Sequence, residues 1–309
     1  MIDLDKNRLA HVRARFPNVS LGNDSHEALS DPRVNAVVVA TPTSTHHTLI
    51  RSALHAGKHV LAEKPITTSS NDAEELCGLA ARLGLVLMVG HVFVYNRAVQ
   101  AVRRYVEDGT LGLIRYVSMI RTNLGPIRHD VNAAWDLASH DISIANYWLQ
   151  SEPIAVSAVG GSWINPGIQD AVFATLQYPD DVLVNLHVSW LNPRKAREIT
   201  VTGERRMLTF DDMNLGEPIR IYDKQVTEDR ITPSYVDSFA SFRESIHDGD
   251  ITIPKLPPGE PLRTECDHFL DCITKGTRPL TGGAEGLAVV RALEAIERSL
   301  HHAGRQERV

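Results

Sequence analysis

The chain has 309 residues, a formal net charge of −6, 43% hydrophobic residues and three cysteines. At roughly 150 residues per domain this length predicts two domains, and the ordinary apolar fraction argues against a disordered protein. The mild acidity argues against a nucleic-acid partner, and three cysteines make no disulfide framework. No apolar run approaches the ~20 residues that span a membrane, and residues 1–6 lack a signal-peptide pattern, so we expect a soluble cytoplasmic protein.

The first third alternates valine- and alanine-rich runs with amphipathic segments. Apolar runs without polar alternation are typical of strands buried on both faces of a parallel sheet. The pattern predicts a helix at 5–15, a strand at 34–40, a helix at 44–56, a strand at 59–62, a helix capped by Ser70 and ending at Gly84, and a strand at 85–89. This order predicts an α/β domain, a Rossmann-like parallel sheet with helices on both faces, over residues 1–92.

The pattern changes after about residue 92. It predicts helices at 96–107, 136–149, 260–273 and 286–301, a strand at 114–121, and several strands between 171 and 210 with breaks at 179–181, 192–193 and 203–204. Val184, Leu186 and Val188 alternate with polar residues, which indicates an antiparallel sheet with one exposed face. We therefore expect an α+β domain with a large, mainly antiparallel sheet over residues 93–309.

The first polar cluster is residues 40–46 (ATPTSTH), directly after the predicted strand at 34–40. In an open parallel sheet, ligands bind beyond the carboxyl ends of the strands. Small hydroxyl residues that open a helix there leave backbone N–H groups for an anion or a ribose. We expect a ligand-binding loop, and the alternative is that Ser44 or Thr45 only caps the helix.

The second cluster is Glu63-Lys64-Pro65, where the proline ends the strand because it cannot continue the ladder. Lys64 is thereby expected at the ligand edge of the sheet. A lysine there can donate to a substrate oxygen and help to move a proton. The alternative is a solvated lysine in a turn.

The third cluster contains Asp136 and His140, four residues apart in a predicted helix and therefore on one face. A carboxylate beside an imidazole can orient it and raise its basicity, which suits a general base. The alternative is a surface pair, but the neighbouring residues Trp135, Leu137 and Ala138 are apolar.

Together and in this order, the three clusters resemble the Gfo/Idh/MocA family of NAD(P)-dependent oxidoreductases. The matching segments are the valine-rich strand into residues 41–46, residues 56–60 (AGKHV) into Glu63-Lys64-Pro65, the pair Asp136 and His140 followed by Asp141, and the helix at 286–301. The resemblance extends from Asp3 to about Leu300. It implies an oxidoreductase that transfers a hydride between NAD(P) and a hydroxyl or keto group of a sugar, cyclitol or nucleotide sugar.

The resemblance also implies a role for each matched residue. Lys64 would contact the reacting oxygen beside the nicotinamide, His140 would transfer the proton, and Asp136 would bind the substrate. The residues implied to line the cofactor are Thr41, Pro42, Thr43, His46 and Glu63. Within the family, residues 123–137 look most like members that act on nucleotide-linked sugars at the 3-position.

On that narrower resemblance, three polar residues would recognise the substrate's polar or phosphate groups. They are Arg121, Asn123 and Arg128. The guanidinium groups of the two arginines are suited to phosphate oxygens. The alternative is that all three are ordinary loop residues.

A G-x-G-x-x-G turn, expected near the start of a dinucleotide-binding domain, is absent from the N-terminal region. Asp3 aligns with the acid that binds the ribose, and its carboxylate favours NAD because it repels a 2′-phosphate, while Lys6 and Arg8 keep NADP open. We expect that the chain starts roughly 30 residues late, by the length of a βαβ unit. One explanation is a misplaced start codon or a gene fragment, which the intact later motifs favour. The other is a short natural protein with lost or reduced dinucleotide binding.

The expected protein is thus an NAD(P)-dependent dehydrogenase, and the alternative is a cofactor-impaired member that binds ligands or serves assembly. Its expected partner is a small sugar or nucleotide sugar, without nucleic acid or membrane. The exposed face of the second sheet predicts a homo-oligomer, because such a face must be covered. Cys266, His268 and Cys272 have no C-x-x-C partner and predict core packing rather than a metal site, and Trp190 is expected to pack on the sheet.

Overall fold

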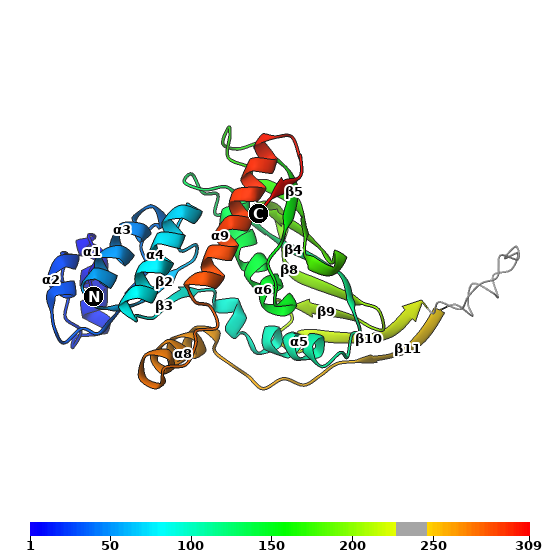
Figure 1. Cartoon of the computed structure of the whole chain (residues 1–309), viewed down its shortest axis with the longest axis horizontal. Helices are drawn as coiled ribbons and strands as arrows, with labels where there is room; N and C mark the ends of the chain where they lie inside the picture. Colours follow the sequence, from blue (N-terminus) through cyan, green and yellow to red (C-terminus); the bar gives the residue numbers. More distant parts are fainter. Residues whose placement is uncertain (227–245) are drawn as a thin grey trace, which may run out of the picture. The chain divides into compact units, whose positions relative to one another are not determined.

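The computed structural model describes residues 1–226 and 246–309 (Figure 1). The chain divides into two compact units. Unit 1 comprises Met1–Gly90 and His268–Leu287, and unit 2 comprises His91–Asp267 and Ala288–Val309. The predicted domain boundary between residues 92 and 93 stays a prediction, and each unit is described by itself.

The described part of unit 1 contains a three-stranded parallel sheet in the order β1-β2-β3. The strands are β1 (Ala36–Val39), β2 (His59–Glu63) and β3 (Leu87–Gly90). Beyond β3, the Val89 N–H donates to Thr281 O at 2.7 Å, and Met88 forms an antiparallel bridge with Gly282. The predicted parallel α/β sheet is confirmed, and a segment from the second part of unit 1 covers its β3 edge.

The expectation that the first strand is buried on both faces is wrong. Val38, in the middle of β1, is 64% exposed, and Val39 is the one buried residue of this strand. Within the described residues β1 pairs with β2 alone, so it lies at the edge of the sheet. An apolar run is therefore compatible with an edge strand as well as with a central one.

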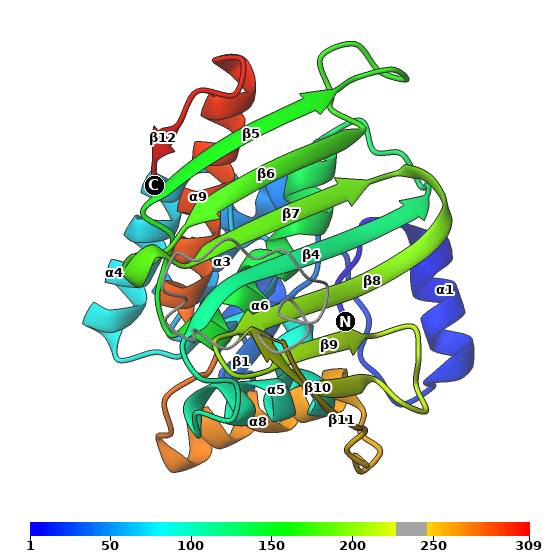
Figure 2. The ribbon, with the colours of Figure 1, turned by 90° about the vertical axis from the view of Figure 1, so that its right-hand side faces the viewer.

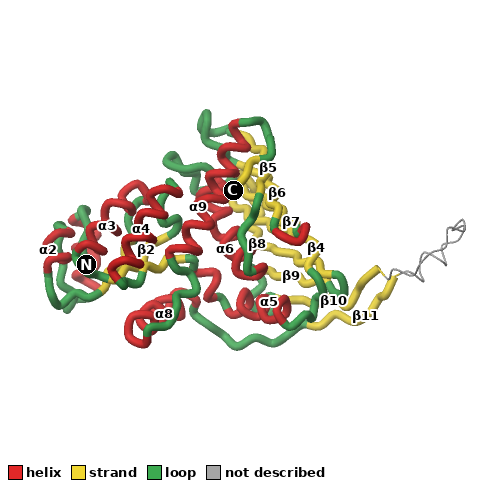
Figure 3. The backbone as a smooth tube through the Cα atoms, in the orientation of Figure 1, coloured by secondary structure: helices red, strands yellow, loops and turns green. Residues whose placement is uncertain are grey.

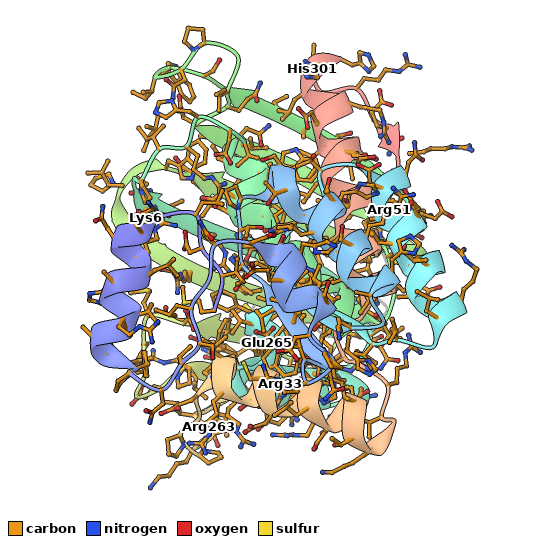
Figure 4. The ribbon with its side chains drawn as sticks, turned by 90° about the vertical axis from the view of Figure 1, so that its left-hand side faces the viewer. Lys6, Arg33, Arg51, Arg263, Glu265 and His301 are labelled. Atoms are coloured by element: carbon orange, nitrogen blue, oxygen red, sulfur yellow. The ribbon has the colours of Figure 1, made fainter. Side chains whose placement is uncertain are left out.

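Helices flank the strands of unit 1. They are α1 (Lys6–Arg15), α2 (Ser25–Ser30), the 3₁₀ turn η1 (Thr43–Thr45), α3 (His46–His55), α4 (Ser70–Leu83) and part of α8 (Pro261–Lys275). The N-cap of α4 is Ser69 rather than the expected Ser70, because the Ser69 hydroxyl accepts from the Asp72 N–H. Arg51 on α3, labelled in Figure 4, forms an ion pair of 3.0 Å with Glu75 on α4.

Unit 2 is built on a large mixed sheet, which has nine strands within the described residues. Its strands are drawn in yellow in Figure 3, and their order, seen face-on in Figure 2, is β11-β10-β9-β8-β4-β7-β6-β5-β12. The strands are β4 (Ile114–Leu124), β5 (Ala155–Gly161), β6 (Ala171–Gln177), β7 (Leu183–Ser189), β8 (Leu191–Gly203), β9 (Met207–Asp211), β10 (Ile219–Val226), β11 (Ile246–Thr252) and β12 (Glu307–Arg308). All pairs are antiparallel except β4 with β7, so the predicted, mainly antiparallel sheet is confirmed.

Within residues 1–226 and 246–309, helices cover one face of this sheet and leave the other open, as Figure 2 shows from the open side. They are the 3₁₀ turn η2 (Val92–Tyr95), α5 (Arg97–Glu107), the π turn η3 (Ala134–Ala138), α6 (Ser139–Leu149) and α9 (Gly283–His301); a short 3₁₀ turn, η4 (Pro179–Asp181), joins β6 to β7. Val184, Leu186 and Val188 are buried, as their alternation predicts.

One predicted hairpin break is wrong. Asn192 and Pro193 lie inside β8, and the chain turns at Trp190, between β7 and β8. The pairing of β8 with β4 shifts register between Leu191 and Ala196. A proline is tolerated in a strand at such an irregularity, because no ladder hydrogen bond needs its missing N–H.

Candidate active site

In unit 1, the loop after β1 is held by its own hydroxyl groups. Thr41 Oγ1 lies 2.7 Å from Thr45 Oγ1, and Thr45 Oγ1 donates to Pro42 O at 2.8 Å. Thr45 precedes α3 but makes no side-chain cap to it, so the simple capping alternative does not describe this residue. Thr41 and Pro42 are exposed and Thr43 is half-buried, so the loop presents hydroxyl groups beyond the carboxyl end of β1.

His46 connects this loop with the loop after β2. Its ring is buried, with Nδ1 2.9 Å from Pro65 O and Nε2 2.9 Å from Thr41 O. Both ring nitrogens are therefore engaged by the backbone. Any part of His46 in cofactor binding is indirect, through the positions of the two loops that carry Thr41 and Lys64.

Glu63 and Lys64 stand at the carboxyl end of β2. Glu63 is exposed and Lys64 is half-buried, and the Lys64 N–H donates to Glu63 Oε2 at 3.3 Å. Gly90, opposite Glu63 at the end of β3, keeps this place open, since a Cβ there would lie 3.3 Å from Glu63 Oε2. A side chain at Gly90 would thus crowd the Glu63 carboxylate.

Asp3 is ordered by its neighbours. Its Oδ1 accepts from the Asp5 N–H at 2.9 Å, and its Oδ2 lies 3.7 Å from Arg8. Hydroxyl and carboxylate oxygens at residues 3, 41, 43 and 63 suit the hydroxyl groups of a ribose. The residues of unit 1 therefore fit the ribose and nicotinamide parts of a dinucleotide, while the printed sequence contains no G-x-G to bind its diphosphate.

In unit 2, the third cluster begins on a π turn that the sequence pattern did not predict. η3 (Ala134–Ala138) precedes α6, and Asn132 Oδ1 accepts from the N–H groups of Ala134 and Trp135. A π turn contains more residues than an α turn, so the i,i+4 argument for one shared face does not carry over to Asp136 and His140. Such single π turns occur frequently at functional sites.

The Asp136 carboxylate is held by donors from two other segments. The Trp190 indole Nε1 donates to Oδ2 at 3.0 Å, and Arg128 Nη1 donates to Oδ1 at 3.3 Å. Arg128 also forks onto Asp130 at 2.9 and 2.6 Å, and this hydrogen bonding holds the pKa of Asp130 below its usual value. Trp190 is fully buried and so packs in the sheet as expected, but its bond to Asp136 was missed.

His140 packs edge-on against Phe93 of η2, with ring centroids 4.9 Å apart. The Arg121 guanidinium lies over the same phenyl ring, 4.4 Å from its centroid, and forms a bidentate pair with Asp141 at 2.7–3.0 Å. Both side chains of this pair are at least 95% buried. The expected recognition of substrate by Arg121 finds no support in this geometry, because Asp141 already takes its guanidinium inside unit 2.

The remaining predicted residues are more exposed. Asn123 is half-buried and its Nδ2 donates to Gly125 O, while Arg128 remains half-exposed.

Cys272 Sγ lies 3.5 Å from His268 Nε2, which also accepts from the Leu280 N–H at 3.1 Å. Within residues 1–226 and 246–309 no group of three or more His, Cys, Asp or Glu is arranged to hold a metal, and no helix is long and apolar enough to cross a membrane.

Comparison with known proteins identifies the class. Residues 1–91 match the model of the oxidoreductase family with an NAD-binding Rossmann fold, and residues 99–209 match the GFO/IDH/MocA C-terminal domain. The chain therefore belongs to the Gfo/Idh/MocA family of NAD(P)-dependent dehydrogenases, and its cofactor is a nicotinamide dinucleotide.

Individual relatives cover most of the chain. It is 31% identical over 262 residues to UDP-N-acetylglucosamine 3-dehydrogenase of Acidithiobacillus ferrooxidans. The aligned region spans 84% of this chain and 76% of that protein. It is 31% identical over 289 residues to scyllo-inositol 2-dehydrogenase (NAD(+)) of Bacillus subtilis, spanning 89% and 78%. The crystal structure of the Acidithiobacillus enzyme superposes on this chain with a TM-score of 0.81 and 24% sequence identity, covering 98% of this chain and 90% of that one. The structure of GenD2 from gentamicin A biosynthesis, in complex with NAD, superposes with a TM-score of 0.79 and 23% identity, covering 100% of this chain and 87% of that one.

Proposed function

We propose that this dehydrogenase acts on a CH–OH group of a sugar, a cyclitol or a nucleotide-linked sugar. Two relatives named above act on a nucleotide sugar and on an inositol. The observation that carries the proposal is the Asp136 carboxylate, held by Trp190 and Arg128 four residues ahead of His140. A fixed carboxylate is an acceptor for sugar hydroxyl groups, and an imidazole can exchange their protons.

In the proposed mechanism, Lys64 of unit 1 and His140 of unit 2 are the proton-handling side chains. A bound nicotinamide cofactor would supply the hydride acceptor for oxidation and the hydride donor for reduction. Lys64 Nζ donates a hydrogen bond to the substrate oxygen and so stabilises its developing negative charge. The His140 imidazole takes the hydroxyl proton as the C–H bond breaks, and it gives that proton back in the reverse direction.

Other residues bind rather than react. Asp3, Thr41, Thr43 and Glu63 would hold the dinucleotide with Pro42 beside them, and His46 would keep the loops in place. For a nucleotide-linked substrate, Arg128 is the proposed phosphate contact, with Asn123 beside it, because its half-exposed guanidinium can fork onto phosphate oxygens as it does onto Asp130. Arg121 is left out of this set.

We also propose that the open face of the unit 2 sheet is covered by a second copy of the chain. Across this face Val159, Phe173, His187 and Ile120 form one row of paired residues, and the Phe173 and His187 rings stack at 4.4 Å. Val159 and Phe173 of this row are exposed, and exposed apolar side chains that lie together are typical of an interface. Light scattering should show a mass above one chain, which Phe173→Asp should lower; a monomeric wild type would contradict the proposal.

Lys64→Met tests the catalytic assignment. With UDP-N-acetylglucosamine and scyllo-inositol as probes, we expect its kcat for nicotinamide reduction to fall about 10²- to 10⁴-fold, the usual contribution of a proton-handling group. Lys275→Met is the matched control, since Lys275 is an exposed lysine of unit 1 paired with Asp271 at 2.8 Å. Near-native turnover of Lys64→Met would show the assignment to be wrong, and sugar binding without any turnover by the wild type would favour the ligand-binding alternative.

A further inference from the structure

We propose that Trp190 is a positioning residue for the reaction, whose indole N–H sets the direction in which the Asp136 carboxylate meets the substrate. The inference rests on the proposed function, since it gives Trp190 an effect only through Asp136. Within the described residues, Trp190 is 54 positions away from Asp136 in the chain and is joined to it by one hydrogen bond of 3.0 Å.

The backbone of Trp190 is fixed on both sides. Its N–H donates to Asp170 O at 3.0 Å, and its carbonyl accepts from the Gly125 N–H at 2.9 Å. The indole ring has no exposed surface. A buried indole N–H needs an acceptor, and the Asp136 carboxylate supplies it.

The segment that holds Trp190 also holds the start of the π turn. Gln169 O accepts from the Ala133 N–H at 2.9 Å, and Gln169 Oε1 accepts from Asn132 Nδ2 at 3.2 Å. Asp170, the next residue, accepts the Trp190 N–H. The segment at residues 169–170, directly before β6, therefore holds both the backbone of Trp190 and the start of the π turn that carries Asp136, and this fixes the distance between the indole and the carboxylate.

The second donor to Asp136 comes from a more exposed place. Arg128 Nη1 reaches Oδ1 at 3.3 Å, longer than the indole bond, and its guanidinium is shared with Asp130. Trp190 is therefore the constant donor, whereas Arg128 can turn toward a ligand. Loss of the indole N–H would remove the shorter of these two hydrogen bonds from the carboxylate.

Trp148 provides a matched control in the same unit. It is as deeply buried as Trp190, and its Nε1 donates to Val99 O at 2.8 Å, a backbone carbonyl of α5. Trp148→Phe and Trp190→Phe each remove one buried indole N–H and similar packing. A merely structural role of Trp190 predicts the same behaviour for both variants.

The kinetic test measures kcat and KM for the sugar probe and for NAD in both variants. We expect Trp190→Phe to raise the sugar KM about 10- to 100-fold, as for a lost hydrogen bond to a charged group, with an unchanged KM for NAD. Trp148→Phe should leave both KM values within about twofold. Equal sugar KM values for the two variants would overturn the inference.

Asp136→Asn separates this inference from the proposed function. If Asp136→Asn keeps the wild-type kcat and sugar KM, the role of Asp136 itself fails. If Asp136→Asn is impaired but Trp190→Phe matches Trp148→Phe, only the inference on Trp190 fails. The double variant Trp190→Phe/Asp136→Asn should lose less than the product of the two single effects, because both act on one hydrogen bond.

A spectroscopic readout covers the case of low turnover. The four tryptophans give four indole N–H signals in a ¹⁵N-correlated NMR spectrum, and Trp190→Phe assigns one of them. We expect Asp136→Asn to shift the Trp190 indole signal and to leave the Trp148 signal in place. An unmoved Trp190 signal would show that the hydrogen bond does not form in solution, which overturns the inference without any activity measurement.

Discussion

The buried pair of Arg121 and Asp141 allows a quantitative test of how unit 2 is held together. Three N–O contacts of 2.7–3.0 Å join the two side chains, which are 5% and 3% exposed. Arg121→Met removes the cation and leaves the Asp141 carboxylate buried without its counter-charge. Breaking a buried pair from one side costs about 3–5 kcal/mol in the free energy of unfolding.

The same substitution on the same strand supplies the control. Arg115, also in β4, lies 3.6 Å from Glu204, and their side chains are 57% and 48% exposed. An exposed pair contributes less than about 1 kcal/mol, because water screens both charges. The prediction is therefore a several-fold larger loss for Arg121→Met than for Arg115→Met.

Urea unfolding followed by tryptophan fluorescence measures the difference. All four tryptophans, at positions 135, 148, 163 and 190, belong to unit 2, so the signal reports this unit. With an m-value of about 2 kcal/mol/M, Arg121→Met should lower the midpoint by about 2 M and Arg115→Met by at most about 0.5 M. Equal midpoints would refute the reasoning. Arg121→Met with Asp141→Leu should recover much of the loss, because no uncompensated charge remains.

Three further predictions concern packing, pH and the loops of unit 1. Gly203→Ala should destabilise unit 2 by about 2–3 kcal/mol in urea unfolding, since a Cβ there would collide with the backbone oxygen of Leu111. Gly216→Ala should change stability little, since a Cβ there would lie in ordinary contact with Asn214 Oδ1, at 3.8 Å. Burial raises the pKa of Tyr178, so the folded state keeps this phenol neutral, and stability should fall as the pH rises above the unfolded value of about 10. Tyr178→Phe should flatten that alkaline decline, and equal slopes between pH values of about 9 and 11 would contradict it. His46→Asn should weaken NADH binding about tenfold, because it releases the loops after β1 and β2. His47→Ala, which loses only a surface hydrogen bond to Glu75, should leave NADH binding unchanged. Fluorescence titration with NADH measures both dissociation constants.

The sequence predicts the local parts of this site and misses the long-range ones. Lys64 could be placed at the end of a strand because Pro65 stops the ladder, and the structure has β2 ending at Glu63. The bond from Trp190 to Asp136 could not be predicted, since the hydrophobic alternation of a strand assigns a face and names no partner. The pairing of Arg121 with Asp141 could not be predicted for the same reason, because Asp141 lies 20 residues away on another element.

The π turn shows why local rules fail where the site begins. Helical periodicity predicted an α-helix from residue 136, and the observed segment is helical from Ala134 onward. A π turn contains one residue more than an α turn, which changes the direction of the side chains that follow it. The spacing of the apolar residues stays close to that of an α-helix, so the sequence pattern does not reveal the turn. The tertiary contacts of residues 132 and 133 with Gln169 accompany this turn, so its position depends on a segment more than 30 residues later in the chain.

The two arginines that border the Phe93 ring beside His140 are each paired with a carboxylate. Arg121 is paired with Asp141, and Arg197, whose guanidinium also lies over Phe93 at 5.5 Å, is paired with Asp212 at 2.9 Å. Each cation that borders the phenyl ring thus brings its own anion, so the environment of His140 on the Phe93 side combines two neutralised pairs with an aromatic edge. A group that must take a proton in one direction and return it in the other is best placed where neither protonation state meets a large uncompensated charge. On the proposed role of His140, the Arg121 and Arg197 pairs would therefore support its imidazole, which is why the proposed substrate contacts are Asp136 and Arg128.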